Sequence, residues 1–68
     1  MEVIVIINGE PRTIPENTSV AGLLAILGIE GESVAVELDR AIVRRAVWRE
    51  RTLAPGAKLE IVHFVGGG

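Results

Sequence analysis

The chain has 68 residues, of which 49% are hydrophobic, so it has room for one small domain with a single core. Its seven basic and nine acidic residues give a formal net charge of −2, which argues against a general affinity for nucleic acid. The absence of cysteine excludes disulfides, thiolate metal sites and a cysteine nucleophile, and it favours a cytoplasmic location.

The start of the chain predicts a β-hairpin. Residues 2–7 are rich in β-branched side chains and are followed by Asn8-Gly9, a pair typical of tight hairpin turns. Residues 11–14 supply the second strand, which we place at a sheet edge because Pro11 has no N–H to donate. The opening apolar run is too short for a membrane span and lacks the basic start of a signal peptide, so no membrane association is expected.

The next segment predicts a helix. Its apolar residues recur at i, i+3, i+4 and i+7, which places them on one helical face. These residues are Val20, Leu23, Leu24 and Leu27. Thr18 or Ser19 can cap the start of this helix, and Gly28 can end it.

The second half of the chain predicts three further strands. Residues 34–38 and 41–43 are short strand-like runs separated by Asp39-Arg40, which predicts a tight turn. Pro55-Gly56 predicts a turn into a last strand over residues 58–65. The intervening residues, 44–51, predict a short helical turn or a loop.

This order of elements predicts an α+β fold of the ubiquitin-like β-grasp type. We expect a mixed sheet of four to five strands with one main helix packed on one face, and the first and last strands as parallel neighbours in the middle of the sheet because they are the most apolar. The domain is expected to span residues 1–65, with residues 66–68 as a flexible glycine tail.

The first and last strands carry apolar side chains on both faces, whereas one helix can cover only one face. Because side chains alternate along a strand, Val5 and Leu59 are expected in the core and their sequence neighbours on the opposite face. The residues expected on the uncovered face are Ile4, Ile6, Val62 and Phe64. We interpret them as a partner-binding patch close to the tail, with shielding by loops as the alternative.

The tail, Gly66-Gly67-Gly68, has no side chains and extends roughly 10 Å beyond the last strand. It can therefore enter a narrow channel and present the Gly68 carboxylate to a buried active site. A carboxylate is a poor acyl donor, and adenylation by ATP would make AMP the leaving group. A sulfur nucleophile could then leave a thiocarboxylate at Gly68. The residues alone do not identify the nucleophile, and a frayed terminus is the alternative.

Two stretches carry a more specific signal. Residues 38–48, which end in Trp48, and the closing residues 61–68 together resemble the ThiS family of sulfur carriers in thiamine thiazole synthesis. The resemblance extends over essentially the whole chain. The chain departs from the family pattern at Asp39, Ala41 and Arg44, where Asn, Glu and Pro are common. These departures concern the detail of one loop and leave the tail unchanged.

The resemblance implies that a ThiF-like enzyme adenylates Gly68 with ATP and Mg, that a sulfur donor protein supplies the sulfur, and that thiazole synthase (ThiG-like) takes it. Gly67 and Gly68 carry over directly, while Gly66 aligns with a small residue. The alternatives are a MoaD-like sulfur carrier of molybdopterin synthesis, a ubiquitin-like protein modifier joined to lysines through Gly68, and a β-grasp interaction module without tail chemistry.

The remaining polar residues do not indicate catalysis. No carboxylate pair, metal-ligand cluster, phosphate-binding loop or catalytic triad is present in the sequence, so we expect a protein substrate that is not an enzyme and binds no metal or cofactor. His63 is interpreted as a surface strand residue and Trp48 as a cover for the core. A basic cluster is either a solvated face or a dock for an acidic partner. Its members are Arg40, Arg44, Arg45, Arg49 and Arg51.

Overall fold

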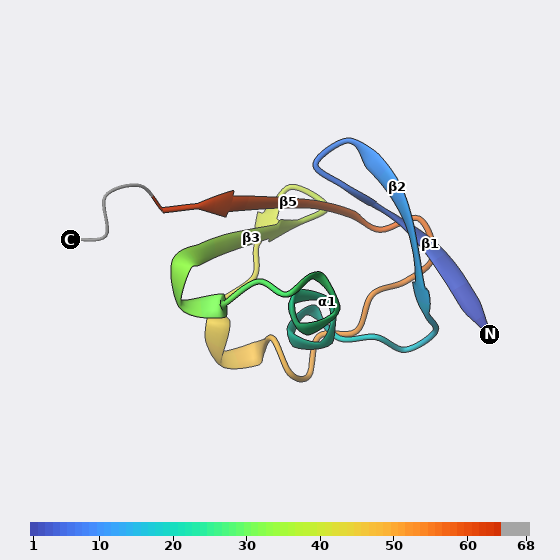
Figure 1. Ribbon diagram of the computed structural model, residues 1–68, viewed down its shortest axis with the longest axis horizontal. Coiled ribbons are helices and arrows are strands. Elements are labelled where there is room, and N and C mark those ends of the chain that lie inside the picture. Colours follow the sequence, from blue (N-terminus) through green and yellow to red (C-terminus); the bar gives the residue numbers. More distant parts are fainter. Residues whose placement is uncertain (65–68) are drawn as a thin grey trace.

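The computed structural model describes residues 1–64 as a five-stranded mixed sheet with one helix lying across one of its faces (Figure 1). The strands are β1 (Glu2–Ile7), β2 (Glu10–Pro15), β3 (Val34–Leu38), β4 (Ala41–Ile42) and β5 (Lys58–His63), in the spatial order β2-β1-β5-β3-β4. The helical elements are α1 (Val20–Leu27) and the short 3₁₀ turns η1 (Gly31–Ser33) and η2 (Arg45–Val47). The predicted ubiquitin-like β-grasp fold is confirmed.

Strands β1 and β5 are parallel neighbours at the centre of the sheet, as predicted, with Ile6 opposite Lys58. Strand β2 pairs antiparallel with β1 along its whole length and forms one edge. The hairpin turn places Asn8 and Gly9 in the left-handed region, at φ 50° and 85°, which is the backbone geometry that an Asn-Gly pair accommodates. The edge position of β2 explains how this strand tolerates Pro11.

Helix α1 begins and ends where the sequence places its caps. The Ser19 side chain accepts a hydrogen bond from the Gly22 N–H at 2.9 Å. Gly28 adopts φ 72° and donates its N–H to the Ala25 carbonyl at 3.1 Å, which closes the last turn. The helix buries Val20, Leu23 and Leu24 against the sheet.

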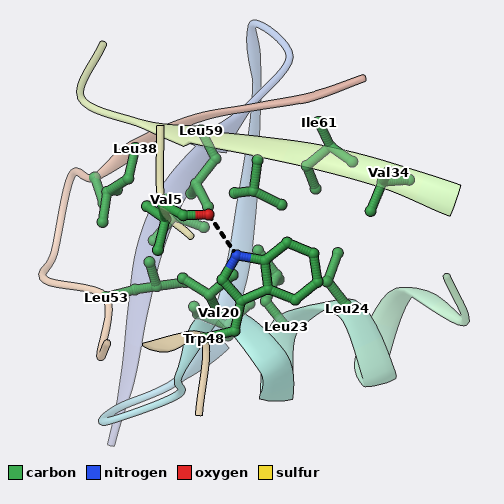
Figure 2. Packing of buried hydrophobic residues seen from close by; sticks show 14 residues of the cluster. Val5, Val20, Leu23, Leu24, Val34, Leu38, Trp48, Leu53, Leu59 and Ile61 are labelled. Atoms are coloured by element: carbon green, nitrogen blue, oxygen red, sulfur yellow. Dashed lines mark hydrogen bonds between the residues drawn. The ribbon is translucent and has the colours of Figure 1, made fainter. Parts of the chain in front are cut away.

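The core lies between α1 and one face of the sheet, and it is aliphatic except for Trp48 (Figure 2). The indole N–H of Trp48 donates to the Val43 carbonyl oxygen at 2.7 Å, so the buried polar atom of this side chain is satisfied. The interpretation of Trp48 as a cover for the core is confirmed, since only 6% of the side chain is exposed. Gly31 lies against the indole, because a Cβ at this position would come within 2.8 Å of the Trp48 ring.

The second hairpin is shorter than predicted. Strand β4 contains only Ala41 and Ile42, because Val43 turns into the core while its N–H still donates to the Val36 carbonyl at 2.9 Å. The predicted turn at Asp39-Arg40 is present, and both of its residues have positive φ values, 49° and 75°.

Candidate functional site

Strand β5 leads directly into the C-terminal residues. All five residues of β3 pair with it. The antiparallel register runs from Leu38 opposite Leu59 to Val34 opposite His63. Beyond the strand, the Phe64 N–H donates to the Ser33 carbonyl at 2.9 Å. The chain is therefore hydrogen-bonded up to the last residue that the structure describes. The predicted tail residues Gly66, Gly67 and Gly68 lie outside the described residues.

On its other side, β5 is held by β1 and by a side chain. The ladder between these two strands contains only two residue pairs, the last of them Ile7 opposite Leu59. The Asn8 backbone N–H donates to the Leu59 carbonyl at 2.8 Å. The Asn8 carboxamide then bonds both backbone groups of Ile61: its Oδ1 accepts from the Ile61 N–H at 2.8 Å, and its Nδ2 donates to the Ile61 oxygen at 3.2 Å. Asn8 thus continues the pairing beyond the end of β1.

Sequence reasoning assigned Asn8 to the hairpin turn only and missed this second role. One signal was available, since asparagine offers both a donor and an acceptor on its side chain. The partner, Ile61, is 53 residues away along the chain, and no local pattern connects the two positions.

The opposite end of β5 is held in a similar way by Asp39. Its side-chain Oδ1 accepts from the Lys58 N–H at 3.1 Å, and its own N–H donates to the Lys58 carbonyl at 2.7 Å. Asp39 stands where the resembled family commonly has Asn. A carboxylate suffices for this contact because the Lys58 N–H requires only an acceptor.

The predicted alternation of faces is observed in β5. Leu59 and Ile61 are buried, whereas Val62 is 55% exposed and Phe64 is 59% exposed on the opposite face. In β1, Ile4 is 55% exposed, while Ile6 is only partly exposed.

The exposure of Ile4, Val62 and Phe64 is as predicted, but the structure does not bring all four residues into one continuous patch, and their role in binding a partner stays a prediction. Ile6 is level with Lys58, and Val62 lies four positions further along β5, about 13 Å away at the usual strand rise. On the same face of β5, the charged residue Lys58 lies beside Ile6, and Glu60 lies between the levels of Ile6 and Val62. The residues are separated because the two parallel strands are offset, and β1 ends level with the beginning of β5. Only Val62 and Phe64 lie near the end of β5 that leads into the tail, and we call this pair the tail-end pair.

The uncovered face is polar near the β3–β4 turn and the beginning of β5. A hollow of about 400 Å³ lies there, lined by Glu37, Asp39, Arg40, Lys58 and Glu60. Three carboxylates and two cations share this hollow, so it has no dominant charge. Within residues 1–64, no group of three or more His, Cys, Asp or Glu side chains is arranged to hold a metal ion.

The basic cluster predicted from the sequence is divided by the structure. Arg45 donates to the Gly31 carbonyl at 2.9 Å, and its guanidinium lies 5.5 Å from the centre of the Trp48 ring, so it is occupied in packing the η1 turn. Arg40 instead lines the hollow at the β3–β4 turn. His63, the last residue of β5, is exposed.

The fold and the glycine ending together define a class, that of the ubiquitin-like β-grasp proteins with a C-terminal glycine tail. The model of the ThiS family matches residues 5–68, which includes the tail, and the chain belongs to this family. No helix in the described part of the chain has the length and apolar character needed to cross a membrane.

Solved structures agree with this assignment. The crystal structure of the thiamine biosynthesis protein ThiS from Geobacter metallireducens is similar with a TM-score of 0.85 and 32% sequence identity, covering 97% of this chain and 100% of that one. The solution structure of a thiamine biosynthesis protein from the same organism gives a TM-score of 0.79 at 30% identity, with coverage of 97% and 88%.

The curated relatives are of two kinds. A thiazole synthase from Magnetococcus marinus is 42% identical over 62 residues, which cover 91% of this chain and 19% of that protein. The protein ycf40 of Pyropia yezoensis is 37% identical over 62 residues, covering 91% of this chain and 87% of that protein. The chain thus spans about a fifth of the length of the thiazole synthase that it matches and most of the length of ycf40.

Proposed function

We propose that this chain is a sulfur carrier of thiamine biosynthesis and that the Gly68 carboxylate is the group that carries sulfur. The observation that carries the proposal is the match to the ThiS family through residue 68 on a confirmed β-grasp fold. The similar solved structures are named as thiamine biosynthesis proteins, which supports the pathway. In this role the protein is a substrate of other enzymes.

The proposed chemistry has two steps. In the first, an oxygen of the Gly68 carboxylate attacks the α-phosphorus of ATP and releases pyrophosphate, which leaves an acyl-adenylate. In the second, sulfide attacks the carbonyl carbon, a C–S bond forms, and the C–O bond to AMP breaks to leave the thiocarboxylate. If a persulfide delivers the sulfur, its terminal sulfur displaces AMP and an acyl disulfide forms. A thiol then attacks the sulfur of the donor in this acyl disulfide, which releases the thiocarboxylate and leaves a disulfide between the thiol and the donor.

The proposed partners follow from this chemistry. A ThiF-like enzyme supplies ATP, Mg and the adenylation site, and a sulfur donor protein supplies the sulfur. Two relatives that are 42% and 41% identical to this chain are named thiazole synthase, and the matched region is 19% of each. This similarity supports a thiazole synthase as the enzyme that takes the sulfur from Gly68.

The described residues support the delivery of a thin terminus. Strand β5 is hydrogen-bonded on the β3 side up to Phe64, so the tail begins from a fixed point on the sheet. The exposed tail-end pair, Val62 and Phe64, lies next to that point and offers apolar surface to an enzyme that draws in the tail.

The adenylation step is tested by ATP–pyrophosphate exchange with a ThiF-like enzyme. The full chain is expected to support exchange, and a chain that lacks Gly68 is expected to support little, because its carboxylate ends about 3.5 Å short. Equal exchange with both chains, or none with the full chain when the enzyme is active on another ThiS protein, would contradict the proposal. Accumulation of adducts on lysines of other proteins would indicate a modifier instead.

A further inference from the structure

We propose that Asn8 is a positioning residue whose side chain holds the outgoing strand β5 in place for delivery of the tail. The inference rests on the proposed function, because the positioning matters only if an enzyme must receive the C-terminus. Asn8 directly follows β1 and lies just beyond Ile7 and Leu59, the last residue pair of the β1–β5 ladder.

The carboxamide takes the place of a further residue of β1. A strand residue facing β5 would offer one acceptor to an N–H and one donor to a carbonyl, and Asn8 offers both to Ile61, at 2.8 and 3.2 Å. The backbone N–H of Asn8 bonds Leu59 two positions earlier on β5. Asn8 therefore bonds two successive residues of β5 that face β1.

The other side of β5 shows why this contact matters. The Lys58 carbonyl accepts from the N–H of Asp39, which follows β3, and the Phe64 N–H donates to the carbonyl of Ser33, which precedes β3. The even-numbered residues of β5 therefore direct their backbone groups toward β3. Ile61 and His63 direct theirs toward β1. Asn8 is the last group to bond this side of β5 among the described residues, and without it the final part of the strand is paired on one side only.

The turn alone does not require asparagine. At φ 50°, glycine or aspartate is equally suited to the first position of such a hairpin turn. Glycine would keep the turn but leave both backbone groups of Ile61 to water, and aspartate would keep the acceptor while losing the donor. The choice of side chain is thus explained by the contact with Ile61.

The structural half of the proposal is tested by amide hydrogen exchange of the Asn8→Gly variant. We expect protection of the Ile61 amide to fall by about tenfold, because its acceptor is lost, while the Val62 amide, which faces β3, stays protected. Asn17→Gly is the matched control, since Asn17 also has a positive φ, 68°, and is exposed. Unchanged protection of Ile61 would overturn the proposal.

The functional half is tested by steady-state adenylation of the same variants with a ThiF-like enzyme. We expect Asn8→Gly to raise the KM for the carrier about three- to tenfold with kcat nearly unchanged, because the loss of one or two hydrogen bonds loosens the approach of the tail without altering the carboxylate. Asn8→Asp should fall between Asn8→Gly and the unmodified chain. Asn17→Gly should leave KM unchanged.

The outcomes separate this inference from the proposed function. If Asn8→Gly loses Ile61 protection yet keeps the KM of the unmodified chain, Asn8 does not position the tail. If the unmodified chain is not adenylated at all, the proposed function fails, and the exchange experiment still decides whether Asn8 holds β5. If Asn8→Gly does not fold, Asn8→Asp decides the proposal through its KM, since it keeps the acceptor for the Ile61 N–H and removes only the Nδ2 bond to the Ile61 oxygen. A KM equal to that of the unmodified chain would then overturn the positioning role.

Discussion

At the scale of single residues, the packing of Trp48 explains why residue 31 is a glycine. Its ring packs beneath the η1 turn, its indole N–H bonds the Val43 carbonyl, and Arg45 lies over its face. Gly31 contacts the ring where a Cβ would be 2.8 Å away. The η1 turn ends at Ser33, whose carbonyl accepts a hydrogen bond from the Phe64 N–H. The turn that packs on Trp48 therefore also holds the residue that follows β5.

We predict that Gly31→Ala lowers the free energy of unfolding by about 1–3 kcal/mol, because the ring or the turn must shift to accommodate the methyl group. Urea unfolding measures the effect. Glu32→Ala is the control, since Glu32 is exposed on the same turn and its replacement should change stability by less than about 0.5 kcal/mol. Equal stability of Gly31→Ala and the unmodified chain would show that the packing of Trp48 does not require glycine at residue 31.

At the scale of elements, the β3–β4 hairpin combines a useful contact with backbone strain. Asp39 bonds the beginning of β5, but Arg40 has φ 75°, in the left-handed region that side chains with a Cβ rarely adopt. Such a turn is normally completed by glycine at its second position. The strain is compatible with a short β4 that pairs with β3 through only two residue pairs.

We predict that Arg40→Gly raises the free energy of unfolding by up to about 1 kcal/mol, because relief of the left-handed strain outweighs the added freedom of the unfolded chain. Arg44→Gly is the opposing control. Arg44 has φ −67°, so glycine relieves nothing there and should lower stability. Thermal or urea unfolding of the two variants compares them directly, and a loss of stability in Arg40→Gly would contradict the account of this turn.

The elements themselves could be predicted because their signals are local. Ser19, Gly28 and the apolar face between them fix the bounds of α1, and Asn8-Gly9 fixes the first hairpin. The central position of β1 and β5 follows from their apolar composition. Their register could not be predicted, because it depends on how the whole intervening chain packs. The contact between Asn8 and Ile61 depends on that register.

At the scale of the whole molecule, the offset of β1 and β5 separates the exposed apolar residues that these two strands place on the uncovered face. Ile4 lies toward one end of the sheet, and the tail-end pair, Val62 and Phe64, lies at the other end, with charged residues between them. Composition and alternation predicted the exposure of Ile4, Val62 and Phe64, while Ile6 is only partly exposed. They could not predict that the two strands overlap over so few residues, and the candidate patch was therefore drawn too large.

This separation provides a matched test of which surface meets the activating enzyme. We predict that Phe64→Lys raises the KM for adenylation by about tenfold or more, because it places a charge in the apolar contact beside the tail. Ile4→Lys should have little effect. Both side chains are exposed to a similar extent, 59% and 55%, so both variants should fold. Equal KM values for the two variants would exclude the tail-end pair as the contact surface.

The central claim, that Gly68 carries sulfur for thiazole formation, is tested most directly by intact mass spectrometry. The full chain is incubated with a ThiF-like enzyme, ATP, Mg and a sulfur source, and thiazole synthase with its substrates is then added. We predict a mass gain equal to the exchange of one oxygen for sulfur, located at Gly68, which is lost again as thiazole synthase turns over. Sulfur-independent turnover of thiazole synthase, or a chain that never gains sulfur under conditions that load another ThiS protein, would contradict it.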